Sequence, residues 1–217
     1  MINKAFILFD LDGTLTDPAS GITKSVNYAL EFFGIKTEDL CELCKFIGPP
    51  LKGSFMKYYD FDEARAELAV EKYREYFREI GIYENELIEG IDTLLAKLSE
   101  DGRQLIVATS KPKVFADIIL EHFGLAKYFG LVCGSELDGT RVNKDEVITY
   151  ALEMAGISDL SSAVMVGDRE HDVIGALRNG IDCIGVLFGY GSREELQEAG
   201  ATLIVGSVKE LEEALMV

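Results

Sequence analysis

Short runs of apolar residues recur along the chain, each three to five residues long and each close to residues that favour turns. A short apolar run rich in Val, Ile and Phe is typical of a strand buried on both faces of a parallel sheet. Segments with apolar residues at helical spacing lie between these runs, and a glycine follows shortly after each segment. The predicted strands span residues 5–9, 105–108, 131–133, 163–166, 183–187 and 203–205.

This alternation predicts an α/β fold built on a doubly wound parallel sheet, because helices must carry the chain from the end of one parallel strand to the start of the next. Each predicted helix is followed within four residues by a glycine, which is a residue that commonly closes helices. The predicted helices span residues 92–98, 114–123, 146–155, 173–179 and 194–199.

One long stretch breaks the alternation. Residues 22–33 and 62–80 have helical spacing, and no apolar run between residues 17 and 88 predicts a strand. The simplest interpretation is an inserted helical domain that acts as a cap. We therefore predict an α/β core of residues 1–16 and 89–217 and a helical cap of residues 17–88.

The charge balance narrows the range of partners. The 217 residues include 21 Lys and Arg against 38 Asp and Glu, so the formal net charge is −17. Nucleic acids and anionic membrane surfaces both require a basic footprint, so neither is an expected partner. No apolar run approaches the roughly 20 residues that span a bilayer, and no signal-type segment is evident. We expect a cytoplasmic protein, a monomer or a homodimer.

The cysteines do not predict a disulfide framework or a metal site. Cys41, Cys44, Cys133 and Cys183 are few and scattered for a chain of this length. Cys41 and Cys44 form a C-x-x-C sequence, but no second pair and no nearby histidine complete a zinc site. Small apolar residues on one helix face are the favoured interpretation.

Asp10 and Asp12 directly follow the first predicted strand. Active sites of open α/β sheets lie at the carboxyl ends of the strands. Residues i and i+2 of an extended chain point to the same side, so the two carboxylates converge unless the turn diverts them. Two like charges held close together require a counter-charge, which a divalent cation with oxygen ligands can supply. The pair predicts a Mg²⁺-assisted reaction at Asp10.

Residues 10–14, Asp-Leu-Asp-Gly-Thr, resemble the first motif of the haloacid dehalogenase-like hydrolases. The other three motifs of that family follow in order along nearly the whole chain. Thr109 resembles the hydroxyl residue of the second motif, Lys144 resembles the lysine of the third, and residues 167–172 resemble the acidic fourth motif. The resemblance implies the fold predicted above and a Mg²⁺-dependent phosphatase that acts on a small phosphate ester.

The resemblance also implies roles for the acidic residues. Asp10 would attack phosphorus and form an aspartyl-phosphate, and Asp12 would act as general acid and then as general base. Mg²⁺ would be held by Asp10, by the backbone carbonyl of Asp12 and by Asp168. Asp172, one helical turn beyond Asp168 if a helix starts there, would bind the metal, a water molecule or the lysine.

The phosphate group would be held by the remaining motif residues. Lys144 would pair with Asp10 and the phosphate at once, which offsets the repulsion between nucleophile and substrate. The Thr109 hydroxyl and backbone N–H groups near Leu11 and Ser110 would complete the cradle.

Substrate choice is expected in the cap, because the core handles only the phosphoryl group. Lys24, Lys52 and Tyr190, the last in a Gly-Tyr-Gly turn, are candidate substrate-binding residues. The helical insertion and that turn resemble the phosphoglycolate phosphatase-like branch of the family. Within that branch, residues 16–18 and 47–51 most resemble members described as 5′-nucleotidases. Nucleoside 5′-monophosphates and phosphoglycolate both remain open as substrates.

Three alternatives use similar residues. A phosphomutase would pass the phosphoryl group to a sugar instead of water. A receiver-type signalling module also gathers aspartates, Mg²⁺ and a lysine, but it has no use for Asp12 or for a lid of about 70 residues. A haloacid dehalogenase would use the nucleophile without needing Asp12 or a metal.

Overall fold

The computed structural model describes residues 4–216. The chain forms two compact units, one of residues up to Asp17 together with those from Leu87 onward, and one of Pro18–Glu86. Among residues 4–216, no helix combines the length and the apolar character needed to span a lipid bilayer.

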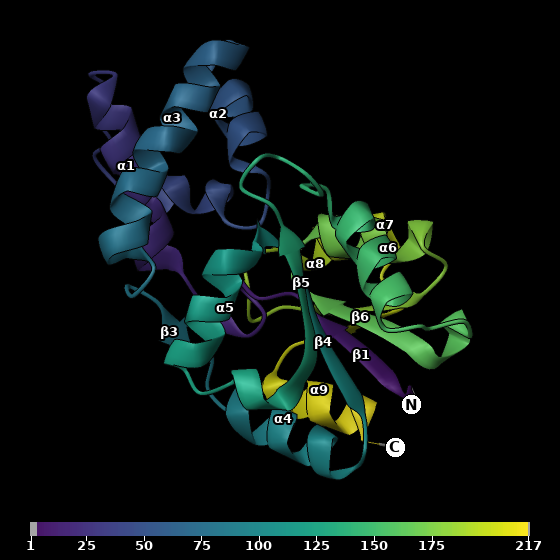
Figure 1. The fold of residues 1–217 in the computed structure, drawn as a ribbon. Helices are drawn as coiled ribbons and strands as arrows, with labels where there is room; N and C mark the ends of the chain where they lie inside the picture. Colours follow the sequence, from purple (N-terminus) through teal and green to yellow (C-terminus); the bar gives the residue numbers. More distant parts are fainter. Residues whose placement is uncertain (1–3, 217) are drawn as a thin grey trace. The chain divides into compact units, whose positions relative to one another are not determined.

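The first unit is built on a six-stranded parallel sheet with strand order β5-β4-β1-β6-β7-β8 (Figure 1). Each of the six apolar runs predicted as strands lies in a strand of this sheet, and the order of the strands across the sheet comes from the structure alone. The main difference is β4, which continues four residues beyond the apolar run and reaches Pro112. The strands are β1 (Phe6–Phe9), β4 (Gln104–Pro112), β5 (Phe129–Ser135), β6 (Ala163–Gly167), β7 (Asp182–Val186) and β8 (Leu203–Val205).

Helices cover both faces of this sheet, as the doubly wound prediction requires. Helices α6, α7 and α8 pack on one face, and α4, α5 and α9 lie on the other (Figure 1). All five predicted helices are present, and α9 was not predicted. The helices are α4 (Ile91–Glu100), α5 (Lys113–His122), α6 (Lys144–Met154), α7 (Glu170–Arg178), α8 (Arg193–Ala199) and α9 (Val208–Leu215), with short 3₁₀ turns η3 (Ala126–Tyr128) and η4 (Leu160–Ser162).

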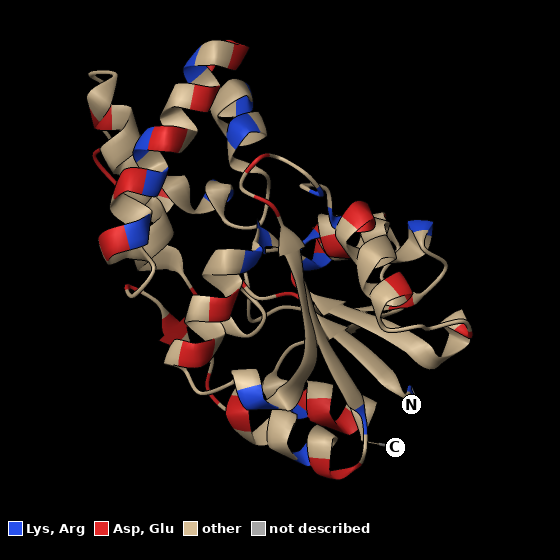
Figure 2. Cartoon of the chain, in the orientation of Figure 1, with Lys and Arg blue, Asp and Glu red and all other residues tan. Residues whose placement is uncertain are grey.

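The apolar core lies between the sheet and these helices. Ile7, Leu8 and Phe9 of β1 are all fully buried, which explains why this strand is apolar at every position instead of at alternate ones. Each such side chain contributes about 1.5–3 kcal/mol when it is buried. Charged residues lie mainly on the helices and loops, and the strands are almost entirely tan, the colour of the other residues, in Figure 2.

Strand β1 lies at the centre of the sheet, where the chain changes direction. The connection from β1 leads to β4 on one side, and the chain later returns to β6 on the other side. Phe9 is level with Val107 of β4 and with Val166 of β6. The residues that follow these three strands therefore meet at one edge, where open α/β sheets bind their ligands.

The second unit is helical. Its core contains a cluster of aromatic rings. Phe46 packs against Phe55 in a tilted arrangement and Phe55 stacks on Phe61, with ring centres 5.0 and 6.0 Å apart. Its helices are α1 (Ala19–Phe32), the 3₁₀ helix η1 (Leu40–Phe46), α2 (Leu51–Tyr59), α3 (Glu63–Tyr76) and the π-helical turn η2 (Phe77–Gly81).

One detail corrects the sequence prediction for this region. Thr16–Asp17 and Glu86–Leu87 form two very short strands, β2 and β3, that pair with each other where the chain passes between the units. No strand was expected between residues 17 and 88. A strand of two residues has too few positions to show a period, so the sequence carries no signal for it.

Candidate active site

The site is centred on Asp10, the first residue after β1. Its backbone N–H donates to the carbonyl of Val166 at 2.9 Å, so the chain is still held against β6 at this point. Asp10 is only 4% exposed. A carboxylate this deeply buried needs charged or polar partners, because burial alone disfavours its ionised form.

Two further aspartates lie beside Asp10. Asp10, Asp168 and Asp172 are all buried, and each offers an oxygen atom within 4.8 Å of those of the other two. Three carboxylates at this separation match the oxygen donors that Mg²⁺ and other hard divalent cations prefer. The structure thus brings together three of the four predicted metal-binding aspartates.

The fourth motif differs in detail from the expected arrangement. Helix α7 begins at Glu170, so Asp168 precedes it and does not share a helix face with Asp172. Instead, Asp172 lies in the first turn and accepts a hydrogen bond from the Arg169 N–H at 3.1 Å. Asp168 accepts one from the Tyr190 N–H at 2.7 Å. The loop and the helix start aim the two carboxylates at the same point.

Lys144, the first residue of α6, joins the acidic cluster. Its ammonium nitrogen lies 2.8 Å from Asp10 Oδ1 and 2.8 Å from Asp172 Oδ1, and it donates to the Ala108 carbonyl at 3.2 Å. Burial opposes the charge on Lys144, but the two carboxylates outweigh it and raise the pKa of the lysine. Lys144 is therefore a permanent cation in this site.

The carboxylates carry more negative charge than Lys144 can balance. Burial, followed by the charges of Asp172 and Asp10, raises the pKa of Asp168 well above its usual value. Burial also raises the pKa of Asp172 to about 6, although Lys144 opposes the shift. Added positive charge would relieve this strain, so the residues present fit a divalent cation.

The side chains of Asp12 and Asp10 contact different lysines. Asp12 is not part of the three-carboxylate cluster, and its Oδ2 lies 2.5 Å from the ammonium nitrogen of Lys111. Burial raises the pKa of Asp12, and the charge of Lys111 opposes that shift. The charge of Asp10 also contributes to the raised pKa of Asp12, but the Asp12 carboxylate pairs with Lys111 and does not join the metal-competent cluster. A backbone carbonyl of Asp12 as metal ligand stays a prediction.

Lys111 is a buried cation that the sequence prediction missed. It lies near the end of β4 and is 9% exposed. Its position two residues after Thr109 was the only available signal, because a lysine near a strand end is usually solvated. The pairing with Asp12 depends on side chains 99 residues apart in sequence.

Thr109 and Ser110 lie at the same sheet edge. Thr109 is 2% exposed, and its Oγ1 accepts a hydrogen bond from the Lys111 N–H at 3.2 Å. That bond uses the oxygen as an acceptor and leaves the hydroxyl hydrogen to be donated elsewhere. The carbonyl of Ser110 accepts a hydrogen bond from Ser135 Oγ at 2.8 Å.

The family model described as haloacid dehalogenase-like hydrolase matches residues 7–186, which include Asp10, Thr109, Lys144 and the fourth motif. The chain belongs to the haloacid dehalogenase-like hydrolases. The resemblance inferred from the four motifs is therefore confirmed at the level of the family.

Relatives of this hydrolase carry different names. A 5′-nucleotidase of Pseudomonas aeruginosa is 54% identical over 191 residues, which cover 88% of this chain and 86% of that protein. The tyrosine-protein kinase PtkA of Mycobacterium tuberculosis is 39% identical over 212 residues, which cover 96% of this chain and 72% of that protein. A solved structure of a predicted phosphatase from Clostridium acetobutylicum shares 55% identity with a TM-score of 0.96, covering 98% of each chain.

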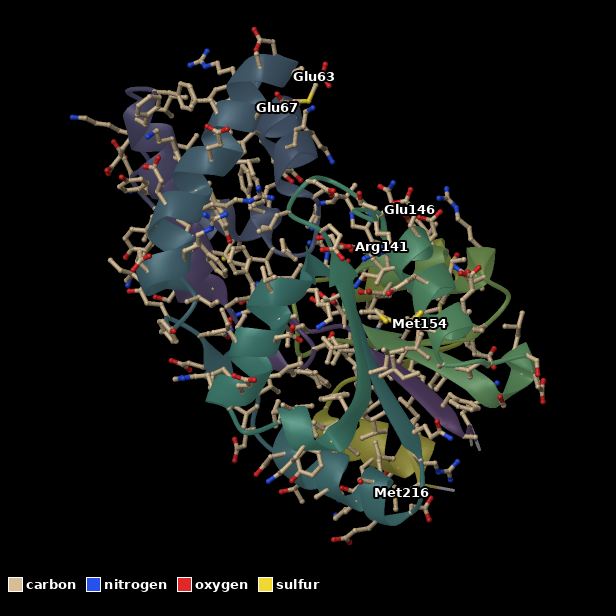
Figure 3. All side chains as sticks on the ribbon, in the orientation of Figure 1. Glu63, Glu67, Arg141, Glu146, Met154 and Met216 are labelled. Carbon is tan, nitrogen blue, oxygen red and sulfur yellow. The ribbon has the colours of Figure 1, made fainter. Side chains whose placement is uncertain are left out.

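The lysines predicted to bind substrate have partners within the helical unit of this hydrolase. Lys24 pairs with Glu84 at 2.5 Å. Lys52 of α2 pairs with Glu63 and Glu67 of α3 at 2.8 Å each, two residues labelled in Figure 3. Their role in substrate binding stays a prediction.

Tyr190 forms hydrogen bonds that its sequence context did not predict. Besides the N–H that it donates to Asp168, its hydroxyl donates to Asp17 Oδ1. Tyr190 therefore contacts both a member of the carboxylate cluster and the last residue of β2.

Cys41 and Cys44 lie in the 3₁₀ helix η1 and form no disulfide. They are not part of the group of metal-competent side chains found among residues 4–216.

Proposed function

We propose that this hydrolase is a Mg²⁺-dependent phosphomonoesterase that forms an aspartyl-phosphate on Asp10. The observation that carries the proposal is the buried cluster of Asp10, Asp168 and Asp172, with Lys144 bridging two of them at 2.8 Å. A nucleophile, a cation site and a fixed ammonium group then surround a single point at the carboxyl edge of the sheet.

The first step transfers the phosphoryl group to the enzyme. An oxygen of the Asp10 carboxylate attacks phosphorus, and the bond between phosphorus and the ester oxygen breaks. Protonated Asp12 gives its proton to the departing alkoxide, which leaves as an alcohol. Lys144 and the Thr109 hydroxyl hold the phosphoryl oxygens in line for this attack.

The second step returns the enzyme to its starting state. A water molecule gives a proton to the Asp12 carboxylate and attacks phosphorus, and the bond between Asp10 and phosphorus breaks. Inorganic phosphate leaves, and Asp10 is a carboxylate again. Asp12 is then protonated and ready for the next substrate, so protons balance over the cycle.

Asp10, Asp168 and Asp172 are the residues that would hold the metal, together with the backbone carbonyl of Asp12. Bound Mg²⁺ would neutralise negative charge between the phosphate and the carboxylates. Neutralisation of negative charge is important for this chain, because its net charge of −17 repels an anionic substrate at long range.

The helical unit of residues 18–86 is proposed to act as a cap that selects the alcohol part of the ester. A nucleoside 5′-monophosphate is the first candidate substrate, because the relative at 54% identity is named a 5′-nucleotidase. Phosphoglycolate is the second candidate, since a phosphoglycolate phosphatase of Neisseria meningitidis is 31% identical over 219 residues.

A phosphoryl transfer to an acceptor other than water is the alternative function. The name of the relative PtkA, a tyrosine-protein kinase, is the observation in its favour. A phosphomutase belongs to the same class. Both would retain the phosphoenzyme on Asp10, so only the fate of the phosphoryl group separates them from a phosphatase.

The test measures phosphate release from a panel of phosphate esters, including mononucleotides, phosphoglycolate and p-nitrophenyl phosphate. We expect release that depends on Mg²⁺ and stops with EDTA. Asp10→Asn should reduce release at least about 10³-fold with an unchanged circular dichroism spectrum, because it removes the nucleophile.

The matched control is Asp117→Asn, which removes an exposed aspartate that pairs with Lys113 on α5. It should retain the activity of the unaltered protein. Retained activity in Asp10→Asn would contradict the nucleophile assignment. Phosphate release only in the presence of a sugar or protein acceptor would favour the alternative.

A further inference from the structure

Lys111 is a buried cation that the reaction above does not use. Its ammonium nitrogen lies 2.5 Å from Asp12 Oδ2, and the side chains of the two residues are 6% and 11% exposed. We propose that Lys111 is a positioning residue that fixes the Asp12 carboxylate for both proton transfers. The inference rests on the proposed function, because it assigns a partner to the general acid and base of that reaction.

The contact divides the two oxygens of Asp12 between two tasks. Lys111 holds Oδ2, while Oδ1 is buried and has no hydrogen-bond partner among the residues that the structure describes. An unpartnered buried carboxylate oxygen carries an energetic penalty unless a ligand satisfies it. A leaving-group oxygen, or later the attacking water, is the ligand that the proposed reaction brings to this atom. By fixing one oxygen, Lys111 sets the direction of the other.

The end of β4 is shaped to bring Lys111 to this place. Ala108 is level with Cys133 of β5, and Pro112 is level with Ser135. Between these two pairs, three residues of β4 (109–111) lie opposite the single residue Gly134, so β4 contains a bulge. Such a bulge turns side chains away from the directions of a regular strand, and bulges are common beside active sites. With the bulge, the Thr109 hydroxyl can bind a phosphoryl oxygen while Lys111 pairs with Asp12.

Contacts with β5 hold the bulge in place. A Cβ atom added to Gly134 would lie 2.6 Å from the Lys111 carbonyl oxygen, so only glycine allows this approach. Ser135 Oγ donates to the Ser110 carbonyl at 2.8 Å, and the Lys111 N–H donates to Thr109 Oγ1 at 3.2 Å. The backbone on both sides of Lys111 is thereby fixed before substrate arrives, as preorganised catalysis requires.

The alternative is that Lys111 binds an anionic group of the substrate directly. Its burial and its short contact with Asp12 argue against this, since binding a substrate anion would require breaking a buried ion pair. The two roles also differ in kinetics. Loss of a positioning residue lowers kcat, whereas loss of a contact made equally in the ground and transition states raises KM.

The experiment compares Lys111→Met with the unaltered protein on two esters. The p-nitrophenolate group leaves without a proton, whereas the alkoxide of a nucleoside monophosphate needs one. With p-nitrophenyl phosphate, we expect the variant to release one equivalent of p-nitrophenol at a rate within about 3-fold of normal. Steady turnover should then fall about 10²-fold while phosphoenzyme accumulates, because the base is misplaced.

With a nucleoside monophosphate, the first step also needs the acid. We expect a similar fall in kcat, a KM within about 3-fold of normal, and no accumulation of phosphoenzyme. Lys113→Met is the matched control, because that lysine lies two residues further along, is exposed, and pairs with Asp117 at 2.7 Å. It should change neither step.

A double variant keeps the test decisive if Lys111→Met alone does not fold. Adding Lys111→Met to Asp12→Asn removes both charges of the pair, so neither is left buried alone. If Lys111 acts through Asp12, phosphoenzyme hydrolysis in the double variant should stay within about 2-fold of that in Asp12→Asn. A further fall of about 10-fold or more would overturn the inference.

Three other results would also overturn it: normal kcat in a folded Lys111→Met protein, a raised KM with normal kcat, or loss of the p-nitrophenol burst in a folded variant. An unaltered protein without phosphatase activity would instead contradict the proposed function. The failure of the inference and the failure of the function are thus distinguished by the unaltered protein.

Discussion

Replacing Lys144 by Met should destabilise the metal-free protein strongly. Lys144 is 6% exposed and lies 2.8 Å from both Asp10 and Asp172. Met fills most of the same volume without the charge, so the change removes the cation and leaves the core filled. Two buried carboxylates then lose their contact with an ammonium group.

The expected magnitude follows from that loss. Removing one partner of a buried ion pair costs about 3–5 kcal/mol, because the remaining charge stays buried. For a domain of about 150–250 residues, 1 kcal/mol corresponds to roughly 2–4 °C in Tm. Lys144→Met should therefore lower Tm by about 6–20 °C in EDTA at pH 8.

The size of this effect should depend on pH. The charge of Lys144 lowers the pKa of Asp172, so its removal raises that pKa further above about 6. An acid whose folded-state pKa is raised destabilises the fold fully at pH values above that pKa. The penalty disappears as the pH falls through it, because the folded protein then takes up a proton. The gap in Tm should narrow from pH 8 to pH 5.

The assay is thermal unfolding followed by circular dichroism. Lys97→Met is the matched control, because Lys97 forms an ion pair with Glu212 at 2.7 Å in which both side chains are partly exposed. Its effect should stay within about 0.5 kcal/mol. A Lys144→Met protein as stable as the unaltered one at pH 8, or a gap that widens toward pH 5, would refute the reasoning.

Two further predictions concern the metal. Mg²⁺ should raise Tm more at pH 8 than at pH 5, because Asp172, with its pKa raised to about 6, must lose its proton to bind a cation; an equal shift at both pH values in a thermal-unfolding titration would argue against a carboxylate site. Gly189→Ala should weaken Mg²⁺ binding by about 10–100-fold in calorimetry, because an added Cβ would lie 2.3 Å from the Gly13 carbonyl oxygen and 2.4 Å from Asp168 Cβ. Unchanged affinity in a folded Gly189→Ala protein would show that this loop does not position Asp168.

Patterns local in sequence carried the prediction of the fold. The strands of the sheet are buried on both faces, so each is apolar throughout and is visible as a short run. The helices between them are closed by glycines in the left-handed conformation, for example Gly124 and Gly180. The two-residue strands β2 and β3 and the last helix α9 carried weaker signals and were missed.

Some features of the candidate site were likewise predicted from the sequence, and others were not. The strand pattern predicted the position of Asp10, because the carboxyl ends of parallel strands meet at a common edge. Thr109, Lys144 and the fourth motif were identified by their resemblance to the family's motifs. Helix α7 begins at Glu170, three residues before the predicted helix of residues 173–179. Asp168 and Asp172 therefore do not share a helix face, which the sequence had suggested only if a helix started at Asp168. Spacing can suggest which residues meet, but it does not give the direction in which each side chain points.

The sequence by itself determined the family, the α/β architecture and the residues that surround Asp10, because these depend on hydrophobic period and on motifs a few residues long. Only the tertiary structure decided that the Asp12 carboxylate pairs with Lys111. That contact joins residues 99 apart and depends on a bulge in β4 that Gly134 and Ser135 of the neighbouring strand support. No local pattern encodes it, because its cause is the approach of two strands in space.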